Sequence, residues 1–216
     1  ITHNILTKLE YSGGPNQKIL PVFKNYLKMG YYPYSLEFQN IETYFMTLEQ
    51  NLSTTIESDL VSIYPVITGH SVRKMKQLLA FIASEVPFVL SLEKLKRMLD
   101  IGDIRTLKSY LKYLSDAGLI SLLPKASNKI SKIETPEKIY LHNPNQLYAI
   151  SASTPNIGTV RELFFLNMLA VKHELSAPKT GDFLVDGKFL FEIGGRKKGF
   201  EQIKNKENSF IVADDI

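Results

Sequence analysis

The sequence predicts a multidomain α+β protein with three successive parts, and three observations along its 216 residues lead to this prediction. Apolar residues recur at helical spacing through residues 16–66, three helical segments and two short strands fill residues 71–141, and helix and strand patterns alternate over residues 156–216. Charge is also uneven, with net values of −2 over residues 1–68, +6 over 69–145 and zero over 146–216. We therefore place domain boundaries at 68/69 and 145/146.

Residues 1–68 are predicted to be helical. One apolar stripe covers residues 19–27, and the Gly-Tyr-Tyr-Pro stretch at 30–33 interrupts it. Ser35 is a suitable N-cap for a second helix, and a third helix is expected at 52–63. The apolar stripe of the second helix comprises Phe38, Ile41, Phe45 and Leu48.

Residues 69–145 have the element order of a winged helix-turn-helix, which is three helices followed by a two-stranded hairpin. Ser91 opens the short second helix, Gly102 marks the turn, Asp103 caps the third helix and Gly118 ends it. Strands are expected at 119–123 and 138–141, joined by a basic linker at 124–137. The inward residues of the first and third helices are Met75, Leu78, Leu79, Ile82, Ile104, Leu107, Leu111 and Leu114.

The outward face of the third helix predicts DNA binding. Its Lys and Arg side chains can neutralise phosphates, and its hydroxyl and guanidinium groups can reach base edges. The candidate DNA-binding residues are Arg105, Lys108, Ser109 and Lys112 on the helix, and Lys129 and Lys132 in the linker. Winged helices also serve as protein-docking modules, so a partner protein is the alternative ligand.

Residues 146–216 are predicted to form a small mixed α/β unit. A helix is expected at 156–172, strands at 181–185 and 188–193, a helical segment at 200–204 and a final strand at 210–213. Asp186-Gly187 between the first two strands is a two-residue hairpin signal.

Three carboxylates in this unit are candidate catalytic residues. Glu162 lies on the helix, Asp182 at the start of one strand and Glu192 near the end of the next, and Asp182 and Glu192 are the candidate Mg²⁺ ligands. This is the pattern of the restriction-endonuclease-like, or PD-(D/E)XK, fold, in which Asp is followed by Glu-x-Lys. Gly194 stands where the lysine is expected, so an inactive site is the first expectation. The lysines that follow, at 197, 198 and 204, are the candidates to replace it.

Several other classes of protein are excluded. The chain has no cysteine, no apolar run of the roughly 18 residues that cross a bilayer and no secretory signal, so we expect a cytoplasmic protein without a membrane partner. It has no Gly-x-Ser-x-Gly motif and no histidines at metal-ligand spacing. It also lacks a Gly-x-x-x-x-Gly-Lys-Ser/Thr loop and is not expected to hydrolyse ATP by itself.

Taken in order, several stretches resemble the C-terminal region of a prokaryotic family of AAA-type ATPases. They are the Phe23 to Pro33 stretch, the Thr106 to Ile120 stretch, Lys138-Ile139-Tyr140-Leu141, Gly158-x-x-x-Glu162, Gly181-Asp182-Phe183 and Phe191-Glu192-Ile193-Gly194-Gly195-Arg196-x-Lys198. The resemblance implies that residues 1–68 are the helical lid region that follows the nucleotide-binding core. It also implies that this core, with its ATP and Mg²⁺, lies upstream of Ile1, and that the nuclease-like domain is truncated at its C-terminus.

The sequence therefore predicts a DNA- or partner-binding region of an ATPase, with no cofactor of its own and an inactive nuclease-like domain. Its expected partners are DNA, the missing ATPase core and, through oligomerisation, further copies of the same chain. Two alternatives remain open: a Mg²⁺-dependent DNA nuclease that uses the three carboxylates, and a purely protein-docking module of an oligomeric ATPase.

Overall fold

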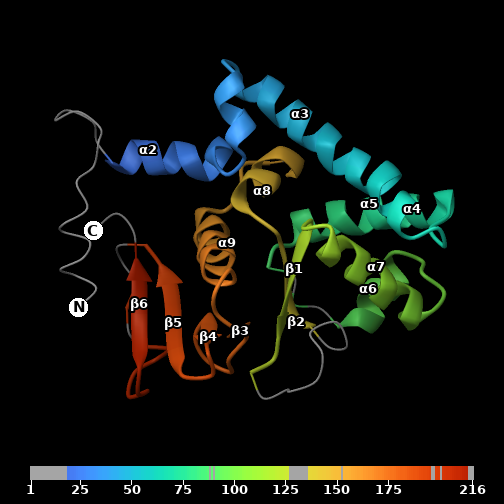
Figure 1. The fold of residues 1–216 in the computed structure, drawn as a ribbon. Helices are drawn as coiled ribbons and strands as arrows, with labels where there is room; N and C mark the ends of the chain where they lie inside the picture. The colour runs from blue at the N-terminus through green and yellow to red at the C-terminus, as the bar shows by residue number, and fades with distance from the viewer. Residues whose placement is uncertain are drawn as a thin grey trace.

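The N-terminal part of the chain is a helical layer. The computed structural model describes residues 19–87, 89, 91–126, 136–151, 153–195, 198–199 and 201–213 (Figure 1). The layer begins with α2 (Ile19–Asn25), the π-helical turn η1 (Tyr26–Gly30) and the 3₁₀ turn η2 (Pro33–Glu37). One long helix follows, made of α3 (Ile41–Thr54), the π turn η3 (Thr55–Asp59) and α4 (Leu60–Ile63).

The long helix begins later than predicted. Ser35 is buried inside η2 and caps nothing, whereas the side chain of Asn40 accepts the backbone N–H of Glu42 at 2.7 Å and caps α3. Since α3, η3 and α4 follow one another directly, residues 52–63 continue this helix and do not form a third one.

The inward face of α3 also differs from the predicted stripe, of which only Leu48 is buried. Tyr44 takes the place expected for Phe45, because its hydroxyl donates a hydrogen bond to Asn145 at 2.9 Å in the interior. The helix buries Tyr44, Leu48, Leu52, Ile56 and Leu60.

The middle of the chain has the predicted order of three helices and a hairpin. These are α5 (Gly69–Ser84), α6 (Leu92–Met98), α7 (Ile104–Asp116) and the antiparallel strands β1 (Ile120–Pro124) and β2 (Pro136–Leu141). Both predicted caps are confirmed, since Ser91 accepts the N–H of Lys94 and Asp103 that of Arg105. Gly118 ends α7 with a φ of +66°, which allows the sharp entry into β1.

The last part consists of α9 (Ile157–Leu169) and a four-stranded sheet. Its strands β3 (Leu175–Ser176), β4 (Phe183–Val185), β5 (Phe189–Gly194) and β6 (Ser209–Ala213) lie in that order, with β5 and β6 parallel and the other pairs antiparallel. Asp186 and Gly187 form the predicted two-residue turn with φ of 52° and 65°.

One expected helix is absent. Residues 201–205 form turns rather than the helical segment predicted at 200–204, and Phe200 lies outside the described residues. A five-residue segment gains too few hydrogen bonds to offset helix nucleation, and Asn205 leaves the helical region with a φ of 62°.

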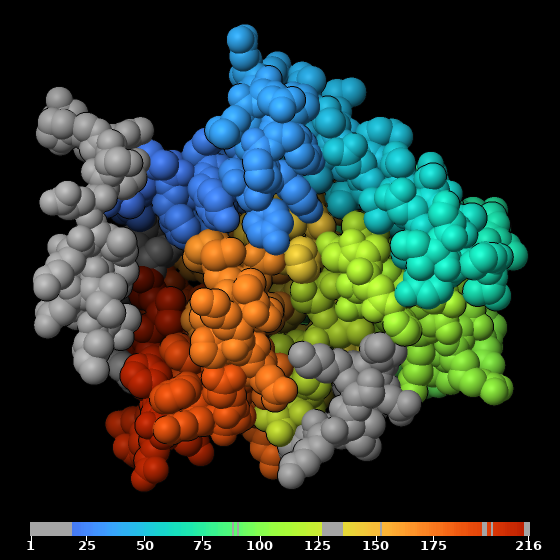
Figure 2. Space-filling model, viewed as in Figure 1, coloured from blue at the N-terminus to red at the C-terminus, as the bar shows by residue number. Residues whose placement is uncertain are grey.

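A short helix that the sequence did not predict, α8 (Pro144–Ile150), connects these parts. It begins next to the expected 145/146 boundary, and it packs on α3, η1 and α9. The buried apolar residues form one cluster that extends from Leu27 to Ile193. In the space-filling view the blue N-terminal helices lie directly against the orange α9 and the green helices (Figure 2). None of the helices in the described part of the chain is long and apolar enough to cross a membrane.

Candidate functional site

The helix α7 presents the predicted DNA-binding residues on one face. Leu107, Leu111 and Leu114 are fully buried against the rest of the fold, and Tyr110 is buried beside them. On the opposite face Arg105 and Lys112 are exposed, whereas Lys108 and Ser109 are half-buried. The side chain of Arg105 is 89% exposed. Two of the predicted DNA-binding residues, Lys129 and Lys132, lie outside the described residues.

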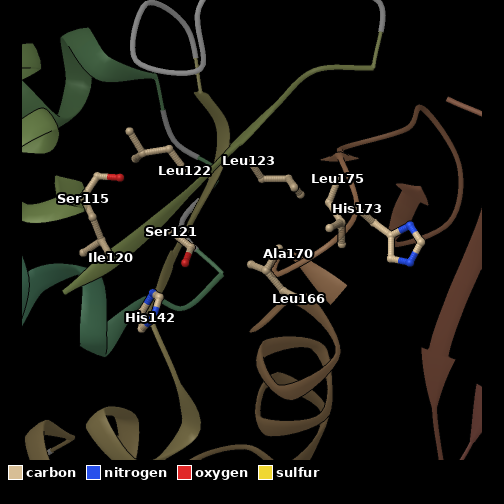
Figure 3. A pocket seen from close by; sticks show the side chains of 10 residues that line it. All are labelled: Ser115, Ile120, Ser121, Leu122, Leu123, His142, Leu166, Ala170, His173 and Leu175. Carbon is tan, nitrogen blue, oxygen red and sulfur yellow. The ribbon is translucent and has the colours of Figure 1, made fainter. Parts of the chain in front are cut away.

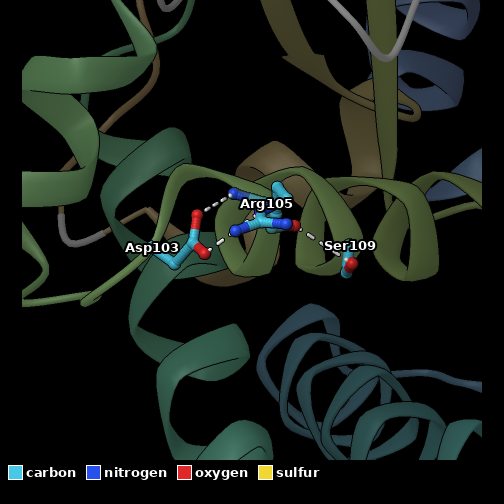
Figure 4. A network of polar contacts seen from close by, with 3 residues as sticks. All are labelled: Asp103, Arg105 and Ser109. Atoms are coloured by element: carbon cyan, nitrogen blue, oxygen red, sulfur yellow. Dashed lines mark hydrogen bonds and ion pairs between the residues drawn. The ribbon is translucent and has the colours of Figure 1, made fainter.

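Asp103 and Arg105 form a compact pair at the start of α7 (Figure 4). One carboxylate oxygen of Asp103 accepts the backbone N–H of Arg105 at 2.8 Å, and the other accepts the guanidinium Nε–H at 3.2 Å. The backbone N–H, and then the guanidinium charge, hold the pKa of Asp103 below its ordinary value. One turn later, the hydroxyl of Ser109 donates to the carbonyl of Arg105 at 3.1 Å.

At the other end of α7, a residue of the helical layer, Tyr64, contacts the helix. Lys112 forms an ion pair with Asp116, and the hydroxyl of Tyr64 donates to the same carboxylate at 2.8 Å. The rings of Tyr64 and Tyr113 lie 4.3 Å apart. Lys112 is therefore exposed but paired, whereas Lys108 is half-buried and has no ion-pair partner within the described ranges.

The three candidate carboxylates lie around one region of the C-terminal unit. Asp182 precedes β4, and its side chain accepts the backbone N–H of Ile193 at 2.7 Å, which places it beside Glu192 on β5. Burial of the Glu162 side chain on α9 is the main cause that raises the pKa of Glu162. The charge of Asp182 raises this pKa further.

Glu192 is fully buried, and a lysine reaches it. The ammonium of Lys198 lies 2.5 Å from one carboxylate oxygen, and beyond this ion pair neither oxygen has a hydrogen-bond partner among the described residues. The hydrogen bond with Glu192, with the charges of Asp182 and Glu162, raises the pKa of Lys198. Of the replacement lysines that the structure describes, Lys198 and Lys204, it is Lys198 that reaches Glu192. Lys204 is exposed in a turn, and Lys197 lies outside the described residues.

Gly194 explains how Lys198 reaches that position. A Cβ atom at residue 194 would lie 2.5 Å from both Cβ and Cγ of Lys198, closer than side-chain atoms approach one another. The glycine that stands in place of the expected lysine therefore leaves the space through which the later lysine passes.

Tyr140 is a member of this cluster that sequence reasoning missed. It comes from β2 of the hairpin, is fully buried, and donates its hydroxyl to Glu162 at 2.7 Å. Tyr140 and Glu162 are 22 positions apart in different predicted domains, so no local pattern connects them.

The cluster has two carboxylates suited to a hard cation and one lysine suited to an anion. Asp182 and Glu192 offer oxygen ligands, and Mg²⁺ is commonly held by one or two carboxylates with water and substrate oxygens as the other ligands. Within the described ranges, no group of three or more His, Asp or Glu side chains is arranged to hold a metal ion.

A separate hollow of about 470 Å³ lies between β1 and the end of α9 (Figure 3). Burial lowers the pKa of His142 at its floor, and His173 at its rim pairs with Asp186 at 2.7 Å. None of the three candidate carboxylates lines it. Its lining residues are Ser115, Ile120, Ser121, Leu122, Leu123, His142, Leu166, Ala170, His173 and Leu175.

Comparison with known proteins identifies a family. A family model described as "Domain of unknown function (DUF8612)" matches residues 20–155, which run from α2 to just before α9. No curated protein and no solved structure matches the chain. The matched region includes α7 and its exposed face, and it excludes the three carboxylates.

Proposed function

The chain belongs to the family of the domain of unknown function DUF8612, and we propose that it is a DNA-binding region whose contact surface is the first half of α7. The observation that carries this proposal is the face formed by the exposed Arg105 and the half-buried Lys108 and Ser109, on a helix whose opposite face is buried. Lys108 and Arg105 give this face positive charge for phosphates, and the guanidinium of Arg105 supplies donors for base edges.

The surroundings of α7 support this proposal. The order of α5, α6, α7, β1 and β2 is that of a winged helix-turn-helix, in which the third helix enters the major groove. The net charge of +6 over residues 69–145 favours a polyanionic ligand. We propose further, on the sequence resemblance, that this region belongs to an AAA-type ATPase and acts together with its nucleotide-binding core.

The test is a titration of labelled duplex DNA with the whole chain at increasing salt. Affinity is expected to fall as salt rises, because bound lysines displace counterions. The Lys108→Glu variant is expected to bind about 10-fold more weakly or worse, and Lys112→Glu is expected to have a smaller effect because Lys112 is already paired.

Lys206→Glu is the matched control, since it makes the same charge change at an exposed site in the C-terminal unit. An equal loss in Lys206→Glu and Lys108→Glu would assign the binding to net charge and contradict the role of α7. No binding at low salt would reject the DNA-binding proposal and favour a protein-docking module.

A second candidate function is metal-dependent cleavage of DNA, and the Lys198–Glu192 ion pair is the observation that favours it. The strand order β3-β4-β5-β6 with a parallel last pair is compatible with a restriction-endonuclease-like unit. Asp182 and Glu192 would hold the ion, which when bound supplies an activated water. Lys198 would then neutralise charge on the scissile phosphate.

Cleavage is tested with plasmid DNA and Mg²⁺ or Mn²⁺. An active site requires cleavage by the wild-type chain that EDTA and Asp182→Asn both abolish, while Glu174→Gln, an exposed carboxylate in the same unit, retains it. Cleavage that survives in Asp182→Asn points to a contaminating nuclease, and the candidate is then rejected.

A further inference from the structure

The exposed face of α7 contains one side chain that is held in a defined orientation. Asp103 uses both carboxylate oxygens on Arg105, one on its backbone N–H and one on Nε (Figure 4). Asp103 is itself fixed as the N-cap of α7. The guanidinium of Arg105 is therefore tethered through Nε to the start of the helix.

This tether leaves the terminal nitrogens of the guanidinium for a ligand. Arginine carries five N–H donors in a planar fork, and engagement of Nε leaves the end of the fork, where each terminal amino group has one N–H directed away from Nε. The side chain remains 89% exposed, so these groups are accessible. A paired fork of this kind matches the O6 and N7 acceptors of guanine in the major groove.

We propose that Arg105 is the base-reading residue of α7 and recognises guanine in duplex DNA, with Asp103 as the residue that positions it. This inference rests on the proposed DNA binding and names the base that the same surface selects. The N-terminal residues of a recognition helix are those that contact base edges, and Arg105 is the second residue of α7.

The charges at this end of the helix favour a base over a phosphate as the ligand of Arg105. The Asp103 carboxylate repels phosphate and offsets the positive charge of Arg105, so the pair is a poor phosphate site. The neighbouring Lys108, without an ion-pair partner in the described part of the chain, suits the phosphate role. The hydroxyl of Ser109 donates to the backbone and is not available as a donor to a base.

The test begins with selection of bound sequences from a randomised duplex pool by the whole wild-type chain. A guanine position is expected in the selected site, and replacement of that base by 7-deazaguanine, which lacks N7, is expected to weaken binding about 10-fold. Arg105→Lys keeps the charge but loses the fork, so it is expected to bind DNA with a similar salt dependence and without the guanine preference.

Asp103→Asn tests the positioning role, because asparagine still caps the helix. A positioning role predicts that guanine preference falls while overall affinity stays equal or rises, since one negative charge is removed. A simple surface ion pair predicts a rise in affinity with the preference unchanged, and that result would overturn the role of Asp103. Arg97→Lys, at an exposed arginine on α6, is the matched control and is expected to leave the preference intact.

The outcomes separate this inference from the function on which it rests. Salt-dependent binding with no guanine preference, or a preference that survives in Arg105→Lys, overturns the inference and leaves DNA binding in place. The absence of any binding at low salt overturns both.

Discussion

Glu192 is a charged residue in the interior of the protein, and a single neighbour makes its burial possible. An isolated buried carboxylate is costly, and removal of one partner from a buried ion pair typically destabilises a protein by about 3–5 kcal/mol. Lys198 supplies the partner at 2.5 Å, and its side chain passes over Gly194 to do so. The ion pair therefore depends on three residues: Glu192, Lys198 and Gly194, which has no side chain to obstruct Lys198.

Gly194→Ala is expected to lower the free energy of unfolding by about 1–3 kcal/mol, because the new methyl group overlaps Lys198 and displaces it from Glu192. Urea denaturation measures the change. Gly102→Ala is the control, since a Cβ there meets no atom within 4 Å, and it is expected to change stability by less than about 1 kcal/mol. Equal effects of the two substitutions would contradict the steric explanation.

At the scale of elements, α8 connects the helical layer with the rest of the chain, because it packs on α3 and η1 and also on α9. The buried side chain of Asn145 accepts hydrogen bonds from the Tyr31 backbone at 2.8 Å and the Tyr44 hydroxyl at 2.9 Å. It donates to the carbonyls of Tyr26 at 3.2 Å and Leu27 at 2.8 Å. A single amide thus satisfies polar groups at the end of α2–η1 and on α3, which fixes how these helices meet α8.

Asn145→Ala is expected to lower the free energy of unfolding by about 3–5 kcal/mol, because it leaves several buried donors and acceptors without partners. Asn51→Ala is the matched control on α3, where the exposed amide has one long hydrogen bond of 3.4 Å, and a change of about 0.5 kcal/mol or less is expected. Chemical denaturation measures the free energy of unfolding of both variants. A similar loss in Asn145→Ala and Asn51→Ala would contradict the role of Asn145 in fixing the helices around α8.

At the scale of the whole molecule, the predicted domains share one interior. The buried apolar cluster is continuous from Leu27 to Ile193, and the Tyr140–Glu162 hydrogen bond connects the hairpin with α9. Shared burial of this extent couples the unfolding of the parts it joins.

We therefore expect a single cooperative unfolding transition. The chain contains no tryptophan, so Phe45→Trp on α3 and Phe210→Trp on β6 each introduce one fluorescent probe at a partly exposed site. The two probes are expected to report the same urea midpoint. Midpoints that differ by more than the error would show that the helical layer and the C-terminal unit unfold independently.

Local signals predicted much of the fold. Local sequence predicts the helix starts at Ser91 and Asp103 and the turn at Asp186-Gly187, because each of these residues acts on backbone groups within three positions. The start of α3 was placed wrongly because Ser35 and Asn40 are both suitable caps, and the burial of Tyr44 through Asn145 decides which face turns inward. The short helix α8 gave no periodic signal of its own.

The candidate sites divide in the same way. The sequence by itself determined the helix α7 and three residues of its buried stripe, Leu107, Leu111 and Leu114, since periodicity along one helix fixes which residues lie together. The predicted Ile104 is half-buried, and the stripe also contains Tyr110. Only the tertiary structure decided that Lys198 pairs with Glu192, that Tyr140 donates to Glu162, and that Tyr64 of the helical layer donates to Asp116 on α7. Those pairs depend on how separate elements pack, and packing is set by the shape of the whole interior rather than by any spacing along the chain.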